Sequence, residues 1–161
     1  MTDNVLEIRN MSVDFLTDSG RLRAVRGASF TVPRGKILGL VGESGCGKST
    51  LASVIIRLMS DNAVVSGDGV IFEGTDLMAL PPEKMRALRG KEITMIFQDP
   101  MTSLNPVLSI GMQMTDIQHR SKISKAEKRK IAGDMLAKVG IPDPEARLDQ
   151  YPHEFSGGMR Q

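Results

Sequence analysis

The alternation of apolar and polar residues predicts β structure over residues 1–32. Apolar residues occupy alternate positions in two sets, Leu6 and Ile8, then Met11, Val13 and Phe15. The two sets are out of phase by one residue, which indicates a bulge or kink near Asn10.

The same pattern predicts four further strands and one turn. "GASFTV" alternates cleanly through Ala28, Phe30 and Val32, and "DSGR" before it is a turn that joins two strands. The apolar run "KILGLV" (36–41), bounded by glycines, is typical of a strand buried on both faces. Residues 70–73 and 92–97 complete the predicted strands.

Helices are indicated by capping residues, terminators and three- to four-residue apolar spacing, and these signals predominate after residue 97. Helices are predicted over 48–59 and over "PPEKMRALRG", which has prolines at its start and Gly90 past its end. The clearest helix follows Ser124, which forms a capping box with Glu127. Its remaining markers are Ile131, Met135 and Val139 at four-residue intervals and the terminators Gly140 and Pro142. We therefore expect an α/β domain over 1–97 and a helical domain over 98–161.

Composition narrows the class of protein. The 161 residues are 40% hydrophobic and 25% charged, which are globular values. A net charge of +2 does not favour nucleic-acid binding, and we interpret the basic run 122–130 as a solvated helix face rather than a phosphate- or lipid-contacting patch. Cys46 is the only cysteine, so a reducing compartment fits. The start of the chain lacks the pattern of a secretory signal, and no apolar run approaches the ~20 residues that span a bilayer. A cytosolic location is expected.

The stretch "GESGCGKS" (42–49) matches the phosphate-binding pattern G-x-x-x-x-G-K-[ST]. It lies between a predicted strand and a predicted helix, so that glycine amides and the helix N-terminus face an anion together. Lys48 would supply a cation for the outer phosphates, and Ser49 an oxygen for Mg²⁺. The predicted nucleotide-binding residues are Gly42, Glu43, Ser44, Gly45, Cys46, Gly47, Lys48, Ser49 and Thr50. Cys46 is either a small residue at a tolerant position or a thiol close enough to the phosphates for its alkylation to block binding.

Three further stretches distinguish among P-loop proteins. "IFQDP" places Gln98 at the end of a strand, "MTSLNP" follows it, and "FSGGM" (155–159) lies near the end of the sequence. With these motifs in this order, the chain resembles the ATP-binding subunits of ABC transporters over its whole length. Gln98 matches the Q-loop glutamine and "FSGGM" the signature usually written LSGGQ. "FQDPMTSLNP" and "YPHEFSGGMRQ" look most like the branch that imports dipeptides, oligopeptides and nickel, and Met159 in place of Gln is shared by that branch.

The resemblance implies roles that the residues alone do not. Two such subunits pack head to tail, so that Ser156, Gly157 and Gly158 of one would contact the nucleotide held by the P-loop of the other. Gln98 would sense the γ-phosphate, bind Mg²⁺ together with Ser49 and signal to the membrane partner. For adenine stacking the candidate is Phe15, although a core phenylalanine on a strand is nearly as good an interpretation.

The resemblance also implies a fold, cofactors and partners. The expected fold is an α/β P-loop NTPase with an N-terminal antiparallel β part, an incomplete parallel core sheet and a helical subdomain. The cofactors are ATP and Mg²⁺. The partners are a second ABC ATPase subunit, two transmembrane permease subunits and, indirectly, an extracytoplasmic solute-binding protein, without nucleic acid. The chain would be peripheral, on the cytoplasmic face of a bacterial inner membrane.

In the family, the Walker B strand, the catalytic glutamate and the switch histidine follow the signature. This sequence ends before them, and "ITMIFQD" with Asp99 is a poor substitute because Gln98 interrupts it and Pro100 follows. We therefore expect the chain alone to bind ATP without hydrolysing it, and we expect "KILGLV" to be left partly uncovered.

Alternatives remain open at this point. The cargo could be nickel or another small solute. The chain could also be a soluble ABC-type ATPase of DNA repair or translation, although it lacks the long insertions and basic surface expected there. A non-catalytic nucleotide-binding remnant is the third alternative.

Overall fold

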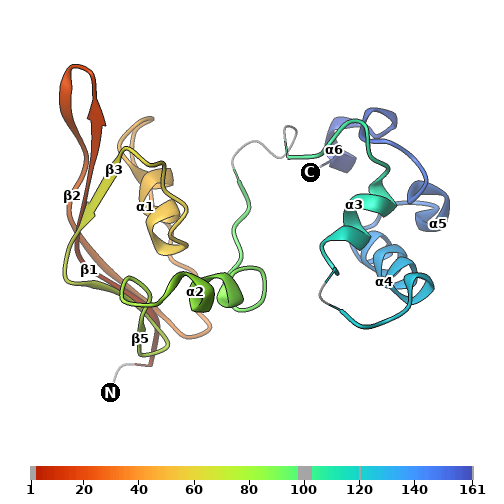
Figure 1. The fold of residues 1–161 in the computed structure, drawn as a ribbon, viewed down its shortest axis with the longest axis horizontal. Helices are drawn as coiled ribbons and strands as arrows, with labels where there is room; N and C mark the ends of the chain where they lie inside the picture. Colours follow the sequence, from red (N-terminus) through yellow and green to blue (C-terminus); the bar gives the residue numbers. More distant parts are fainter. Residues whose placement is uncertain (1–2, 98–102, 120, 161) are drawn as a thin grey trace. The chain divides into compact units, whose positions relative to one another are not determined.

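The computed structural model describes residues 3–97, 103–119 and 121–160. The chain divides into two compact units, residues 1–95 and residues 96–161, which are described separately here (Figure 1).

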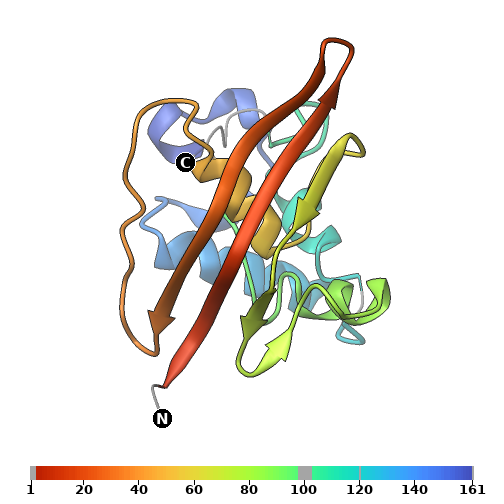
Figure 2. The ribbon, with the colours of Figure 1, turned by 90° about the vertical axis from the view of Figure 1, so that its left-hand side faces the viewer.

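The first unit is built on an antiparallel sheet whose two long strands form a hairpin (Figure 2). The hydrogen-bonded order is β2-β1-β4-β5, and β3 also pairs with β1. The strands are β1 (Asn4–Thr17), β2 (Gly20–Pro33), β3 (Ala63–Ser66), β4 (Gly69–Phe72) and β5 (Thr75–Asp76). The predicted strands at the N-terminus, the turn at Asp18 and the strand near Val70 are confirmed, whereas β3 and β5 had no clear signal in the sequence.

The predicted irregularity at Asn10 is present. The pairing of β1 with β2 shifts register between Ile8 and Met11, and Asn10 has a φ of 49°. The bulge changes which residues face inward, so that Ile8 and Met11 are both buried although three positions separate them. The out-of-phase alternation of the sequence is therefore a real feature of the strand.

Helices α1 (Lys48–Ile55) and α2 (Pro82–Leu88) supply the apolar side chains that cover the sheet. Each fully buried aliphatic side chain stabilises the fold by roughly 1.5–3 kcal/mol relative to its exposed state. Helix α2 ends where Gly90 adopts a φ of 77°, as the sequence predicts. The buried cluster comprises Ile8, Met11, Val13, Leu51, Val54, Val70, Leu77 and Met85.

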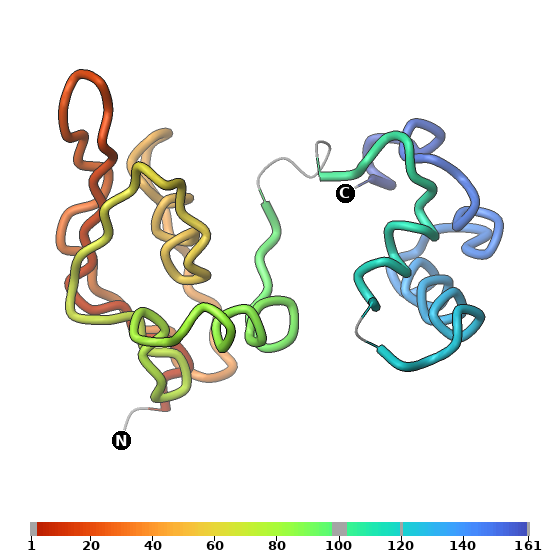
Figure 3. Tube along the Cα trace, viewed as in Figure 1, coloured from red at the N-terminus to blue at the C-terminus, as the bar shows by residue number. Residues whose placement is uncertain are grey.

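Two strand predictions are wrong. Residues 36–41 form no strand, and Figure 3 traces the connection from β2 to α1 as an irregular path. Residues 92–97 make only an isolated bridge from Ile93 to Arg89. A strand needs hydrogen-bonded neighbours, and no described strand lies beside either segment. Apolar side chains of both segments are exposed, with Ile37 at 100% and Ile96 at 92%, and the expected lack of cover over "KILGLV" is therefore present.

The second unit is helical. It contains α3 (Ile110–Asp116), α4 (Lys125–Lys138), α5 (Pro144–Arg147), a 3₁₀ turn η1 (Pro152–Glu154) and α6 (Gly157–Arg160). Its buried cluster is Ile110, Ala132, Leu136, Leu148 and Phe155. No helix among the described residues combines the length and apolar character that crossing a bilayer would require.

The helix predicted after Ser124 is confirmed, including its cap. The Ser124 hydroxyl accepts a hydrogen bond from the Glu127 backbone N–H at 3.2 Å. The buried face differs from the one that the four-residue spacing suggested, because Ile131, Met135 and Val139 are exposed. Ala132, Gly133 and Leu136 pack inward instead.

Candidate functional site

The phosphate-binding loop runs directly into the first helix of the chain. Gly47 is the N-cap of α1 with a φ of 95°, and Gly45 has a φ of 79°. A residue with a Cβ is strained at these angles, whereas glycine adopts them freely. The two glycines therefore turn the backbone sharply just before the helix N-terminus.

Gly47 is also constrained by strand β2. A Cβ at Gly47 would lie 2.6 Å from the Ala24 carbonyl oxygen and 3.0 Å from Cγ2 of Val25. At the other end of the loop, a Cβ at Gly42 would lie 2.7 Å from Sγ of Cys46. The backbone of the loop thus packs closely against both β2 and itself, which explains glycine at both positions.

Lys48 lies across the loop. Its Nζ donates hydrogen bonds to the carbonyl oxygens of Gly42 at 2.8 Å and Glu43 at 2.6 Å, and it contacts Sγ of Cys46 at 3.4 Å. These contacts hold the ammonium group at the loop that the sequence assigns to phosphate.

The loop also carries unpaired backbone donors. The N–H groups of Gly45, Gly47, Lys48 and Ser49 donate no hydrogen bond to any residue that the structure describes. Unpaired amides at a glycine-rich turn and a helix N-terminus suit a bound anion. A polyphosphate fits this set of donors.

Mg²⁺ fits the same place if it arrives together with a nucleotide. Ser49 is exposed in the first turn of α1, with Thr50 beside it half-buried. Among the described residues, no three His, Cys, Asp or Glu side chains gather to hold a metal ion. Mg²⁺ commonly takes few protein ligands and completes its shell with water and phosphate oxygens, so the Ser49 hydroxyl suits an ion that arrives with a nucleotide.

Glu43 and Ser44 are exposed within the loop, so both are open to a ligand. Phe15 lies on β1, in register with Leu22 of β2 and Ala63 of β3. It packs against the first buried cluster and is half-buried, so part of its side chain remains accessible.

Beside Phe15, Asp14 is buried and receives two hydrogen bonds from Arg23, at 2.7 and 3.0 Å. These bonds, with smaller electrostatic contributions from nearby arginines, hold the pKa of Asp14 below its usual value, although desolvation opposes the shift. The ion pair ties β1 to β2 next to Phe15.

The signature stretch lies in the second unit. The Ser156 hydroxyl accepts a hydrogen bond from the Met159 backbone N–H at 3.4 Å, which leaves its own O–H proton available to donate. Beyond the chain neighbours and the helix itself, no atom of the described residues lies within 4 Å of where a Cβ would stand at Gly157 or Gly158, so both present open backbone. The buried Phe155 ring and a hydrogen bond from Nε of Arg160 to the Phe155 carbonyl at 2.9 Å fix this exposed tip to its unit. The predicted γ-phosphate and Mg²⁺ sensor, Gln98, lies outside the described residues.

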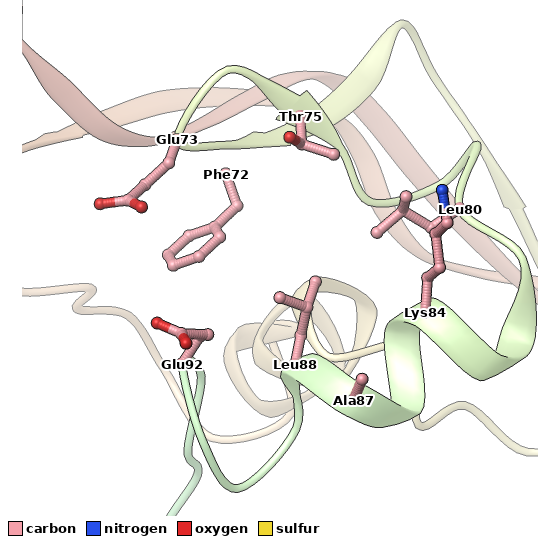
Figure 4. A pocket seen from close by; sticks show the side chains of 8 residues that line it. All are labelled: Phe72, Glu73, Thr75, Leu80, Lys84, Ala87, Leu88 and Glu92. Atoms are coloured by element: carbon pink, nitrogen blue, oxygen red, sulfur yellow. The ribbon is translucent and has the colours of Figure 1, made fainter.

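Two of the cavities in the described part of the first unit bear on the site. A cavity of about 280 Å³ is lined by P-loop residues 46–48 together with parts of β2 and α1. A larger pocket of about 660 Å³ lies between the β4–β5 hairpin and α2, with Phe72, Lys84 and Glu92 among its lining residues (Figure 4). None of the predicted site residues that the structure describes lines the larger pocket.

One residue of the smaller cavity, Arg26 of β2, was missed by the sequence analysis. Its stretch, "AVRG", places Arg26 sixteen residues before Gly42 and has no pattern of its own, so the sequence carried no signal for this residue.

A glycine-rich loop, a lysine across it and a helix N-terminus beside an antiparallel sheet define the chain as a P-loop nucleotide-binding protein. The model of the ABC transporter domain matches residues 25–161, and the chain belongs to the ABC transporter family.

Related proteins agree with this assignment. The chain is 48% identical to the dipeptide transport ATP-binding protein DppD of Bacillus subtilis (strain 168), over 99% of this chain and 48% of that protein. It is 47% identical to the oligopeptide transport ATP-binding protein OppD of the same organism, over 98% of this chain and 44% of that protein. The chain thus spans about half the length of these relatives.

Solved structures show the same fold. The ATP-binding cassette MJ0796, described as dimeric and bound to ADP and Pi, aligns with a TM-score of 0.76 at 19% identity, over 96% of this chain and 65% of that one. CbiO1 of Clostridium perfringens aligns with a TM-score of 0.71 at 23% identity, over 98% of this chain and 58% of that one.

Proposed function

We propose that the chain is the ATP-binding, energy-coupling part of an ABC importer for peptides. The observation that carries the proposal is the phosphate-binding loop, where residues 45–49 bring together the Lys48 ammonium, the N-terminus of α1 and four amides that have no partner among the described residues. Names such as DppD and OppD among relatives with 47–48% identity support peptides as the cargo.

Several residues have distinct tasks in nucleotide binding. Gly45 and Gly47 turn the backbone so that its amides can donate hydrogen bonds to the phosphates, and Lys48 neutralises part of their charge. The Ser49 hydroxyl would hold Mg²⁺, and Phe15 would stack on the adenine. The ion would supply further neutralisation of the phosphate charge.

The signature acts in trans. The Ser156 hydroxyl donates a hydrogen bond to the γ-phosphate bound by a second ABC ATPase subunit, and Gly157 and Gly158 allow the backbone to approach. Gln98 senses the γ-phosphate and Mg²⁺ and relays that state toward the membrane partner. Binding of ATP therefore closes a dimer, and in the whole transporter this closure is transmitted to two permease subunits at the cytoplasmic face of the membrane.

Binding of Mg-ATP is tested by isothermal titration calorimetry on the 161-residue chain. Wild-type protein takes up the nucleotide, and Lys48→Ala weakens uptake at least 10-fold because it removes the loop cation. Lys130→Ala, which removes an exposed lysine of α4 outside the site, leaves the affinity unchanged. Absence of Mg-ATP binding by folded wild-type protein would refute the proposal.

The cargo is tested in cells. Deletion of the gene abolishes uptake of a radiolabelled dipeptide while uptake of nickel continues. The opposite result assigns the chain to a nickel importer.

A further inference from the structure

Strand β2 places a cation beside the nucleotide site. Arg26 lines the cavity of about 280 Å³ that is also lined by Cys46, Gly47 and Lys48. The position of β2 relative to the loop is fixed, because a Cβ at Gly47 would lie 2.6 Å from the Ala24 carbonyl oxygen, two residues before Arg26.

Arg26 forms no close ion pair within the described part of the chain. It interacts electrostatically with Asp14, but this is the smallest of the contributions at that carboxylate, which is held by Arg23 at 2.7 Å and approached by Arg21 at 3.7 Å. Among the residues that the structure describes, Arg26 forms no salt bridge and no side-chain hydrogen bond, and it is exposed.

A second cation at the loop would help to neutralise the negative charge of a bound polyphosphate. Lys48 is the cation of the phosphate-binding motif, and its three donors are directed at the carbonyl oxygens of Gly42 and Glu43 and, at 3.4 Å, at Sγ of Cys46. A triphosphate carries three to four negative charges at neutral pH. A planar guanidinium at the rim of the cavity offers paired donors that match phosphate oxygens.

We infer that Arg26 is a second cationic contact for the polyphosphate of the nucleotide, supplied by β2 rather than by the P-loop. The inference rests on the proposed nucleotide binding and adds a specificity-determining residue to it.

The test compares Arg26→Gln with wild type in calorimetric titrations of Mg-ATP and of magnesium tripolyphosphate, which lacks ribose and base. Loss of one charge-assisted contact weakens both ligands about 3- to 10-fold. Arg26→Lys, which keeps the charge without the planar fork, loses less. Added salt weakens binding less steeply for Arg26→Gln than for wild type, because the variant has one fewer ionic contact for salt to screen.

The control is Arg86→Gln, which removes another exposed arginine of the same unit, on α2 and away from the cavity lining. It leaves both affinities within 2-fold of wild type. Urea unfolding of each variant checks that the fold is retained.

Unchanged Mg-ATP affinity in Arg26→Gln overturns the inference, and so does a loss for ATP without a loss for tripolyphosphate. If wild-type protein binds neither ligand, it is the proposed nucleotide binding that fails. If wild type binds and Lys48→Ala does not, while Arg26→Gln equals wild type, only the role of Arg26 is refuted.

Discussion

Two buried helical glycines of the second unit, Gly111 and Gly133, should respond to alanine in opposite directions. Alanine is favoured over glycine within a helix by up to about 1 kcal/mol. At Gly111 of α3, however, the new Cβ would lie 2.7 Å from the Leu148 carbonyl oxygen, and the Gly111 N–H donates to that same oxygen at 2.7 Å. The backbone of Leu148 is buried with its side chain and has little room to move.

At Gly133 of α4 the obstacle is different. The nearest atom to the new Cβ would be Oε1 of Glu145 at 2.7 Å, the end of a flexible and exposed side chain. Displacing Glu145 weakens a 3.7 Å ion pair with Arg129, and exposed pairs contribute at most about 1 kcal/mol. The Cδ1 of Leu148, at 3.7 Å, makes an ordinary contact.

The expected magnitudes follow from these contacts. Overpacking costs about 1–3 kcal/mol and a strained hydrogen bond about 1 kcal/mol more, so Gly111→Ala lowers the free energy of unfolding by about 1–3 kcal/mol after the helix preference is subtracted. Gly133→Ala changes it by about 0 to +1 kcal/mol.

Urea unfolding followed by far-UV circular dichroism measures the difference. With a denaturant slope of about 1–3 kcal/mol per molar, the two midpoints separate by on the order of 1 M. Equal midpoints, or a more stable Gly111→Ala variant, would refute the reasoning that contact with the Leu148 backbone decides the sign.

Three further predictions concern the first unit. Gly47→Ala lowers the free energy of unfolding by about 1–3 kcal/mol more than Gly45→Ala does, because both glycines have positive φ but only a Cβ at Gly47 would clash with β2. Equal stability of the two variants in urea unfolding would contradict this. The pKa of Asp14 is lowered by Arg23, so its stabilisation is complete above the usual aspartate pKa of about 4 and is lost as the pH falls through the folded-state value. Asp14→Asn therefore flattens the acid side of a plot of unfolding free energy against pH, and an unchanged slope would show that the pair does not contribute. Mg-ATP slows alkylation of Cys46 by iodoacetamide, measured by mass spectrometry; equal labelling with and without nucleotide would place the thiol outside the phosphate site.

The sequence by itself determined the features that depend on local geometry. Gly45, Gly47 and Lys48 identify the phosphate loop because a tight turn with inward amides needs residues without a Cβ followed by a cation. The bulge near Asn10 was visible as a shift in alternation, and the Ser124 cap as a residue type at a helix start. Each of these requirements is met within a few residues along the chain.

The tertiary structure decided what depends on neighbours distant in sequence. "KILGLV" has the composition of a buried strand, yet it lies exposed because a strand forms only beside a pairing partner. Helix α4 buries Ala132 and Leu136 rather than Ile131 and Met135, since the fit against α3 and α5 selects its inner face. Arg26 shares a cavity lining with Gly47 and Lys48 only because β2 packs against the loop, which no local pattern records.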